Sequence, residues 1–152
     1  MKKLIALKGI RDVGKSQTLR TVDELLRGKY SNATVEQERR TRVELTVVLS
    51  INGVRIGIES TDEKISRIQE SFDLFVSFGC DVIICATRTS GKTVTAVKAL
   101  SDYEVVWLEQ RVQSDPIERI FSSIEMARRI VEETEKSIAR AKPAVLSHAA
   151  GR

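Results

Sequence analysis

The feature of this 152-residue chain that most constrains its fold is the octapeptide Gly9-Ile-Arg-Asp-Val-Gly14-Lys15-Ser16 with its two flanks. A short apolar run, Leu4 to Leu7, comes before it and predicts a buried strand. After it, apolar residues recur at helical spacing as far as Gly28, at Leu19, Val22, Leu25 and Leu26. The chain is therefore expected to begin with a strand, a glycine-containing loop and a helix.

The octapeptide fits the pattern G-x-x-x-x-G-K-[ST] at every position. Glycines in such a loop let backbone N–H groups turn toward phosphate oxygens, because side chains would block their close approach. The helix that follows adds the positive end of its dipole. We expect Lys15 to reach the β- and γ-phosphates of a nucleotide and the Ser16 hydroxyl to bind magnesium. The predicted nucleotide-binding residues of this loop are Gly9, Val13, Gly14, Lys15, Ser16 and Gln17.

The rest of the chain predicts alternating strands and helices. Apolar alternation indicates two antiparallel strands, over 43–51 and 54–58, joined by Asn52-Gly53, a dipeptide typical of tight hairpin turns. The polar segment 29–42 has no clear period and predicts a loop. The later segments predict helices over 65–79 and 93–100, strands over 81–86 and 104–108, and a long helix between Asp115-Pro116 and Lys142-Pro143. This order predicts an α/β fold with three layers and a mostly parallel sheet with one antiparallel edge hairpin.

Length and composition favour one domain, over 1–142, followed by a disordered C-terminal tail over 143–152. The N-terminal apolar run is too short for a signal sequence, and no stretch approaches the length of a membrane span, so we expect a cytoplasmic protein with no membrane partner. Cys80 and Cys85 lie in or beside an apolar run and are expected to be reduced packing residues.

On the octapeptide and its flanks the chain resembles the P-loop NTPases, the family of the Walker A motif. The motif covers eight residues, and the order of elements extends the resemblance over roughly the first 110. The resemblance implies a P-loop NTPase-like fold that binds a nucleoside triphosphate, ATP or GTP, with Mg²⁺.

The order of strand, P-loop, helix, hairpin, acidic turn, helix and strand is similar to that of the Ras-like GTPases. In that family the strand after the hairpin turn ends in D-x-x-G, whose two fixed positions fall here on Glu59 and Asp62. The guanine-reading N-K-x-D sequence is also missing after the last strand, where Trp107-Leu-Glu-Gln-Arg111 stands. Guanine specificity and a GTPase switch are therefore not supported, and we expect ATP rather than GTP.

Two acids follow the strand over 54–58 and are the candidates for holding magnesium and orienting a water. Glu59 lies directly at the strand end, whereas Asp62 shares the parity of Ile56 and Ile58. The alternative role is at the start of the next helix, which Ser60, Thr61 or Asp62 could cap. The predicted catalytic residues are Lys15, Glu59 and Asp62, and the predicted metal ligands are Ser16, Glu59 and Asp62. A threonine ligand for magnesium before the hairpin would be Thr34 or Thr41; the sequence does not choose between them.

A second segment, Ala86-Thr-Arg-Thr-Ser-Gly91-Lys92-Thr93, fits a relaxed form of the same pattern. Only one further strand is predicted after it, and its bulkier first residue leaves less room for a phosphate, so we rank it below the first motif. We expect a loop at the same edge of the sheet, from which Arg88 or Lys92 faces the ligand. The alternative is that both charges are solvated.

The leading hypothesis is a magnesium-dependent protein that binds a nucleoside triphosphate and hydrolyses it slowly. One alternative is a small-molecule or nucleotide kinase with a lid that carries Arg39, Arg40 and Arg42. Another is a non-catalytic, nucleotide-gated interaction module, in which the 29–42 segment and the final helix face an unidentified protein partner. A homo-oligomer is left open. Aromatic residues make up only 5% of the chain, which does not favour nucleic acid, and the single histidine, His148, falls in the predicted tail.

Overall fold

The computed structural model describes residues 2–10 and 13–150, except for the side chains of 142–150. Strands and helices follow one another along these residues in the order β1 (Lys2–Lys8), α1 (Lys15–Lys29), β2 (Thr34–Arg40), β3 (Leu45–Ile51), β4 (Val54–Glu59), α2 (Ile65–Ser77), β5 (Val82–Thr87), α3 (Lys92–Lys98), β6 (Tyr103–Glu109) and α4 (Pro116–Ala150).

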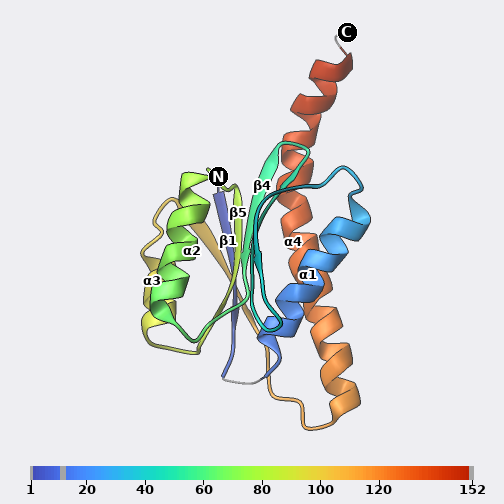
Figure 1. Ribbon diagram of the computed structural model, residues 1–152. Helices are drawn as coiled ribbons and strands as arrows, with labels where there is room; N and C mark the ends of the chain where they lie inside the picture. Colours follow the sequence, from blue (N-terminus) through green and yellow to red (C-terminus); the bar gives the residue numbers. More distant parts are fainter. Residues whose placement is uncertain (1, 11–12, 151–152) are drawn as a thin grey trace.

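The described strands form one six-stranded sheet in the order β2-β3-β4-β5-β1-β6. Strand β1 pairs in parallel with β5 and β6, and β4 pairs in parallel with β5, whereas β3 is antiparallel to β2 and β4. Figure 1 shows α1 and α4 on one face of the sheet and α2 and α3 on the other. The expected α/β fold with a mostly parallel sheet is confirmed.

Each face of the sheet carries its own apolar core. On the face of α1 and α4, alternate residues of β1, β3, β4 and β5 pack against Leu19, Val22 and Ile130. On the other face, Phe72 and Phe75 of α2 cover the sheet. Gly57 of β4 makes this second contact possible, because a Cβ at that position would lie 2.5 Å from the Phe75 ring. The absence of a side chain in β4 therefore sets how closely α2 approaches the sheet.

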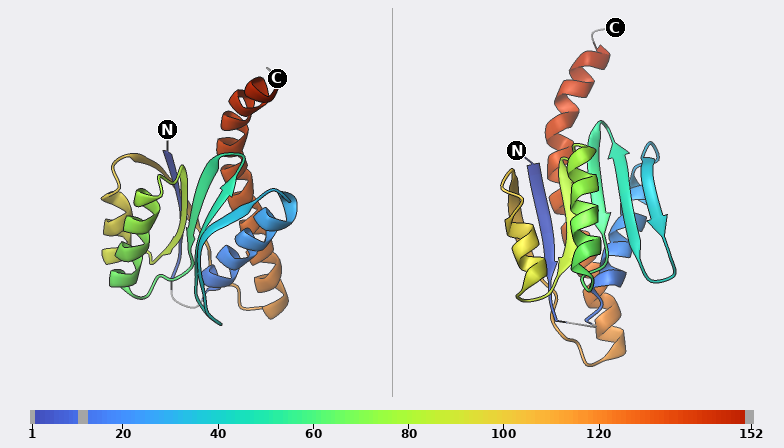
Figure 2. Two further views of the ribbon diagram at one scale, coloured as in Figure 1. Left: turned by 45° about the horizontal axis from the view of Figure 1, so that its top comes forward. Right: turned by 60° about the vertical axis from the view of Figure 1, so that its left-hand side comes forward.

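The predicted hairpin is confirmed by strands β3 and β4. Asn52 and Gly53 join them with φ angles of 52° and 80°, the two positive values that a tight hairpin turn requires. The hairpin does not form the edge of the sheet, however, because β2 pairs with the outer side of β3. The prediction of a loop over 29–42 was wrong for Thr34–Arg40. Figure 2 shows β2 at the margin of the sheet.

The sequence pattern did not predict strand β2, because this strand is stabilised by backbone pairing and ion pairs and not by an apolar face. Most of its residues are exposed. Arg40 pairs with the buried carboxylate of Asp23 in α1 at 2.8 Å, and Glu38 pairs with Arg27 at 2.7 Å. A strand that is held by ion pairs lacks the alternation of apolar and polar residues by which strands are recognised in a sequence.

Helix α4 begins as predicted but continues further. The Asp115 carboxylate accepts a hydrogen bond from the backbone N–H of Ile117, so Asp115 caps the helix. The end predicted at Lys142-Pro143 was wrong, since α4 runs on to Ala150. A proline removes one helical hydrogen bond but need not end a helix. The predicted tail, 143–152, thus overlaps helical backbone as far as Ala150; its last two residues and the side chain of His148 lie outside the described part.

Both cysteines are free thiols and are buried. Burial raises the pKa of Cys80 to about 12 and raises that of Cys85 further. Both are therefore free, buried packing residues, as expected, and their raised pKa values keep the thiols protonated at neutral pH. Among the described helices, none has an apolar stretch of the length that a bilayer crossing requires.

Candidate functional site

The loops that follow β1, β4, β5 and β6 meet at the carboxyl edge of the sheet. From β1 the chain crosses by α1 toward β2, β3 and β4, whereas from β5 it crosses by α3 on the opposite face to β6. The connections of the neighbouring strands β1 and β5 thus diverge to opposite faces of the sheet. In open α/β sheets such a point forms a crevice, and ligands commonly bind there.

The first motif forms the turn between β1 and α1, and its two glycines are required by its geometry. A Cβ at Gly9 would lie 2.8 Å from the backbone oxygen of Gln110 and 3.1 Å from Val13. Gly14, directly before α1, has a φ of 95° and a ψ of 17°, in the left-handed region that glycine adopts most readily. Residues 11 and 12 of the motif lie outside the described residues.

The Asp62 carboxylate joins the cations of the two motifs. Its Oδ2 lies 2.7 Å from Nζ of Lys15 and 3.0 Å from Nε of Arg88. The Lys15 side chain is only 4% exposed, and its ammonium also donates to the backbone oxygens of Gly9 and Ile10. Lys15 and Arg88 therefore contact the same carboxylate at the mouth of the crevice.

A cavity of about 650 Å³ opens beside this ion pair. Its walls come from the start of α1, the turn between β2 and β3, and the loop after β4. Five of the predicted site residues line it: Gly14, Lys15, Ser16, Gln17 and Asp62. Two further arginines, Arg20 and Arg42, line the same cavity, as do two further acids, Glu44 and Glu63. The volume is in the range of small-molecule sites in proteins.

The hydroxyl of Ser16 faces the turn between β2 and β3, where it donates to the backbone oxygen of Val43 at 3.2 Å. Of the two candidate threonines, Thr41 lies in this turn, and its hydroxyl accepts from the N–H of Glu44 at 2.9 Å. Thr34 pairs with Ser50 at the opposite end of β2. The geometry thus brings Thr41, rather than Thr34, toward Ser16.

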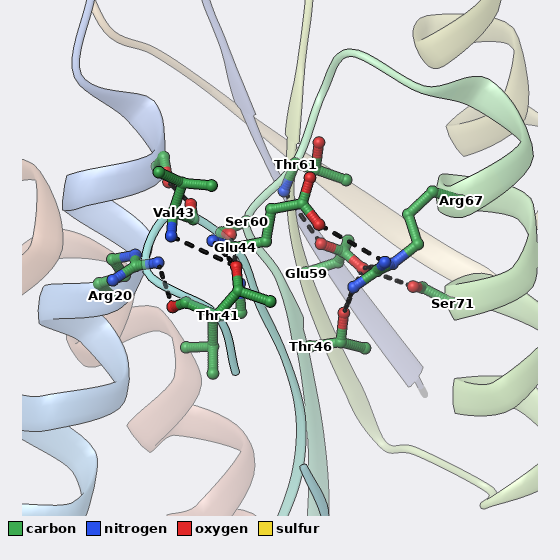
Figure 3. A network of polar contacts seen from close by, with 12 residues as sticks. Arg20, Thr41, Val43, Glu44, Thr46, Glu59, Ser60, Thr61, Arg67 and Ser71 are labelled. Atoms are coloured by element: carbon green, nitrogen blue, oxygen red, sulfur yellow. Dashed lines mark hydrogen bonds and ion pairs between the residues drawn. The ribbon is translucent and has the colours of Figure 1, made fainter. Parts of the chain in front are cut away.

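Glu59 is buried on the far side of β4 from the cavity, and its contacts hold it there. Figure 3 shows Thr46, Arg67 and Ser71 around its carboxylate. Thr46 donates at 2.6 Å, the Thr61 N–H donates at 3.0 Å, and the Arg67 guanidinium lies 3.5 Å away. Glu59 is fully buried and does not line the cavity. Of the two predicted acids, only Asp62 lies in the cavity wall.

Strand β4, which carries both acids, is not adjacent to the strand of the first motif. Strand β5 lies between β1 and β4. Asp62 reaches Lys15 because it stands three residues beyond the strand end, in the loop that runs into α2. The acid at the strand end itself, Glu59, faces α2 instead.

Gln110, at the end of β6, is a site residue that the sequence pattern did not indicate. It is 3% exposed, and its side-chain amide donates to the backbone oxygen of Val13 at 2.9 Å. Its amide oxygen accepts from the Thr18 hydroxyl at 2.8 Å, and its own N–H donates to the backbone oxygen of Lys8. Gln110 therefore makes hydrogen bonds at the start of the first motif, to Lys8, and at its end, to Val13 and Thr18. It also lies 3.3 Å from the Ser123 hydroxyl of α4.

The second motif differs from the first in backbone and in burial. Gly91, before α3, has a φ of 93° and a ψ of −153°, outside the left-handed helical region that Gly14 adopts. Lys92 is exposed, and the Thr93 hydroxyl accepts from the Arg88 N–H at 3.0 Å. Neither of the two predicted cations lines the cavity, but Arg88 contacts the site through Asp62.

Thr87 ends β5 beside the first motif, and its carbonyl accepts from the N–H of Gly9 at 3.1 Å. Its hydroxyl is buried without a hydrogen-bond partner among the described residues. A buried hydroxyl of this kind is usually satisfied by water or by a ligand.

The three arginines proposed for a lid have separate environments. Arg39 and Arg40 lie on β2, where Arg40 is paired with Asp23 and Glu38. Arg42 lies in the turn that lines the cavity. Only Arg42 of the three is therefore available to the site.

No family model, curated protein or solved structure matches this chain. Within the described residues no group of three or more histidine, cysteine, aspartate or glutamate side chains is arranged to hold a metal ion.

Proposed function

We propose that the protein binds Mg²⁺ with a nucleoside triphosphate, ATP rather than GTP, in the cavity beside Lys15, and hydrolyses it slowly. The observation that carries the proposal is the pairing of Lys15 and Arg88 on either side of one carboxylate at the cavity mouth. Two cations that share one internal anion are arranged to share a phosphate instead.

The chemistry of the residues fits such a ligand. Gly9 and Gly14 leave the loop without side chains where a phosphate would approach, and the start of α1 favours negative charge. The Ser16 hydroxyl and the Asp62 carboxylate are oxygen donors of the type that Mg²⁺ prefers. Magnesium commonly takes one or two protein ligands and completes its shell with phosphate and water, so a larger acidic cluster is not needed.

Binding is proposed to proceed by an exchange of partners. Lys15 and Arg88 release Asp62 and take phosphate oxygens, and Asp62 is then free to hold the metal, directly or through water. A metal held there would supply charge neutralisation for the phosphates. In the hydrolytic step a water oxygen bonds to the γ-phosphorus, the bond from that phosphorus to the β–γ bridging oxygen breaks, and the water proton passes to solvent. Lys15 and Arg88 stabilise the charge that develops.

Hydrolysis is expected to be slow, on the order of 10⁻³ per second, because the proposed contribution of the site is the positioning and charge neutralisation of the phosphates by Lys15 and Arg88. Phosphate release from Mg·ATP and Mg·GTP tests this. We expect release with Mg·ATP, loss of it with EDTA or Lys15→Ala, and normal release with the matched control Lys92→Ala. Release that persists in Lys15→Ala at the wild-type rate would overturn the proposal.

A phosphoryl acceptor other than water is the second candidate. Arg20 and Arg42 line the same cavity as Lys15 and could hold an anionic small molecule. A kinase would transfer labelled γ-phosphate to such an acceptor in preference to water. A protein that binds nucleotide and releases no phosphate over many hours would instead be a non-catalytic, nucleotide-gated module.

A further inference from the structure

Four large apolar side chains are exposed along the first turns of α4. Ile117 is 63% exposed, Ile120 60%, Phe121 66% and Ile124 37%. Their spacing of three and four residues gathers them on one side of the helix, and we call them the apolar ridge. Figures 1 and 2 show the start of α4 projecting beyond the carboxyl ends of the strands. The sheet therefore does not cover the ridge.

The ridge has the size of an interface core. Four side chains of this size and exposure present on the order of 450 Å² of apolar surface, within the range of the largest patches on monomers, which are often functional. A standard interface buries about 800 Å² on each partner, of which about 60% is apolar. The exposed apolar area of the ridge therefore matches what one side of a stable dimer needs.

A groove lies further along the same face of α4, between α4 and α1. Leu25 and Gly28 of α1 and Val131 of α4 line it, and its volume is about 450 Å³. Positions 117, 121, 124, 128 and 131 follow one another at helical spacing, so the groove continues the line of the ridge. Gly28 leaves the groove open, because a Cβ there would meet no atom within 4 Å.

We propose that a second copy of this chain covers the ridge, by antiparallel packing of the two α4 helices about a twofold axis near Ile124. Ile124 stands seven residues from Ile117 and seven from Val131, about 10 Å along the helix in each direction. A twofold axis at Ile124 therefore places the ridge of each copy in the groove of the other copy. Ridge and groove are two halves of one self-complementary surface, as an isologous interface requires.

The groove carries charges of both signs. Glu24, Glu132 and Glu135 line it together with Lys29 and Arg128, and Lys29 pairs with Glu135 at 2.8 Å. The pairing of the two copies therefore depends on the apolar ridge and not on charge attraction. The proposal does not depend on nucleotide binding, because the ridge and the groove lie outside the cavity beside Lys15.

Sedimentation equilibrium of the full chain tests the pairing. We expect a dimer for wild type and at least a tenfold weaker association for Phe121→Glu, whose side chain is exposed, so the fold of the monomer is kept. Val76→Glu is the matched control, since Val76 is a 46% exposed apolar residue on α2, away from the ridge. A wild type that remains monomeric at every concentration would overturn the proposal, as would equal dimerisation of Phe121→Glu.

Two further variants test whether the two α4 helices pack in the proposed antiparallel register, and not only whether the apolar ridge is covered. Gly28→Leu fills the groove without touching the ridge and should weaken the dimer while the monomer keeps its melting temperature. Ile124→Cys faces its own copy across the axis and should form an intermolecular disulfide under mild oxidation; Val76→Cys should not. Cys80 and Cys85 are buried and do not compete. A dimer that is insensitive to Gly28→Leu and does not cross-link through Ile124→Cys would contradict this pairing.

Discussion

At the level of single residues, the Asp62 carboxylate supplies the negative charge that lies between two cations at the cavity mouth. This carboxylate is 14% exposed and lies within 3.0 Å of both the Lys15 ammonium and the Arg88 guanidinium. It therefore competes with any incoming anion for these two cations. The same carboxylate lines the cavity together with Glu44 and Glu63, and it is the acid that is proposed to serve the metal. Loss of the Asp62 charge should strengthen the binding of an anion and slow the hydrolysis of the nucleotide. A substitution at Asp62 can therefore separate the two roles.

Asp62→Asn should separate the two roles. Without magnesium, ATP should bind about tenfold more tightly, because an amide competes less well than a carboxylate for the cations. With magnesium, phosphate release should fall at least tenfold, because the oxygen donor for the metal is weakened. Calorimetry and a phosphate-release assay measure the two effects. Glu109→Gln, outside the cavity at the same edge, is the control. Weaker metal-free binding in Asp62→Asn would contradict the competition.

Gln110 is expected to act on the site through the first motif. Gln110→Glu keeps the size of the side chain but loses the donor to the Val13 carbonyl, and it sets a carboxylate where the residue is only 3% exposed. An unpaired buried group costs about 1–3 kcal/mol, so we expect at least a tenfold loss of Mg·ATP affinity.

The control for this positioning role is Gln113→Glu, a change of the same kind three residues away. Hydrogen exchange of the backbone around Gly14 should accelerate in Gln110→Glu and not in the control. If exchange accelerates equally throughout the sheet, Gln110 is a general stabilising residue and not a brace for this loop.

At the scale of elements, the contact of α2 with the sheet depends on Gly57. Gly57→Ala would bring a methyl group to 2.5 Å from the Phe75 ring, so α2 must shift outward. We expect a loss of about 1–3 kcal/mol in the free energy of unfolding. Because α2 also carries Ser71 and Arg67, the shift should loosen the contacts of Glu59.

Urea unfolding of a double-mutant cycle checks this. Phe75→Leu removes the ring that the new methyl group meets, so Gly57→Ala should cost less in that background, with a favourable coupling of about 1 kcal/mol. Strictly additive effects of the two substitutions would show that the close contact does not limit α2.

The elements that could be predicted from the sequence are those whose signals are local. The Asn52-Gly53 turn, the strand before Gly9 and the cap at Asp115 depend on neighbouring residues, and all three are confirmed. Strand β2 could not be predicted, because its ion pairs join it to α1. The residues of the candidate site also divide into those that could be predicted from the sequence and those that could not. Lys15 and Ser16 follow from the motif, whereas the pairing of Asp62 with Arg88 and the brace at Gln110 need the order of the strands.

In the molecule as a whole, ion pairs join distant segments and make stability depend on pH. Hydrogen bonds from Lys136 and from Lys3 lower the pKa of Glu133, and the second of these ties α4 to β1. Arg27 and then Arg40 lower the pKa of Glu38, which ties β2 to α1. A carboxyl group whose pKa is lower in the folded state stabilises the fold above its ordinary pKa, and this stabilisation is lost as the pH falls.

We therefore expect the free energy of unfolding to fall as the pH decreases from about 5 to 3, and to fall less steeply in Glu133→Gln. Urea unfolding at a series of pH values measures both slopes, and high salt should reduce the difference between them. Identical slopes for wild type and Glu133→Gln would show that the link between α4 and β1 contributes nothing to acid sensitivity.

Calorimetric titration with Mg·ATP measures whether the molecule binds a nucleotide as proposed. We expect saturable binding to wild type and to Lys92→Ala, weaker binding of Mg·GTP, and at least a hundredfold loss of Mg·ATP affinity in Lys15→Ala, since a phosphate would lose its most buried cation. Equal binding to Lys15→Ala and wild type, or loss of binding in Lys92→Ala alone, would contradict the account.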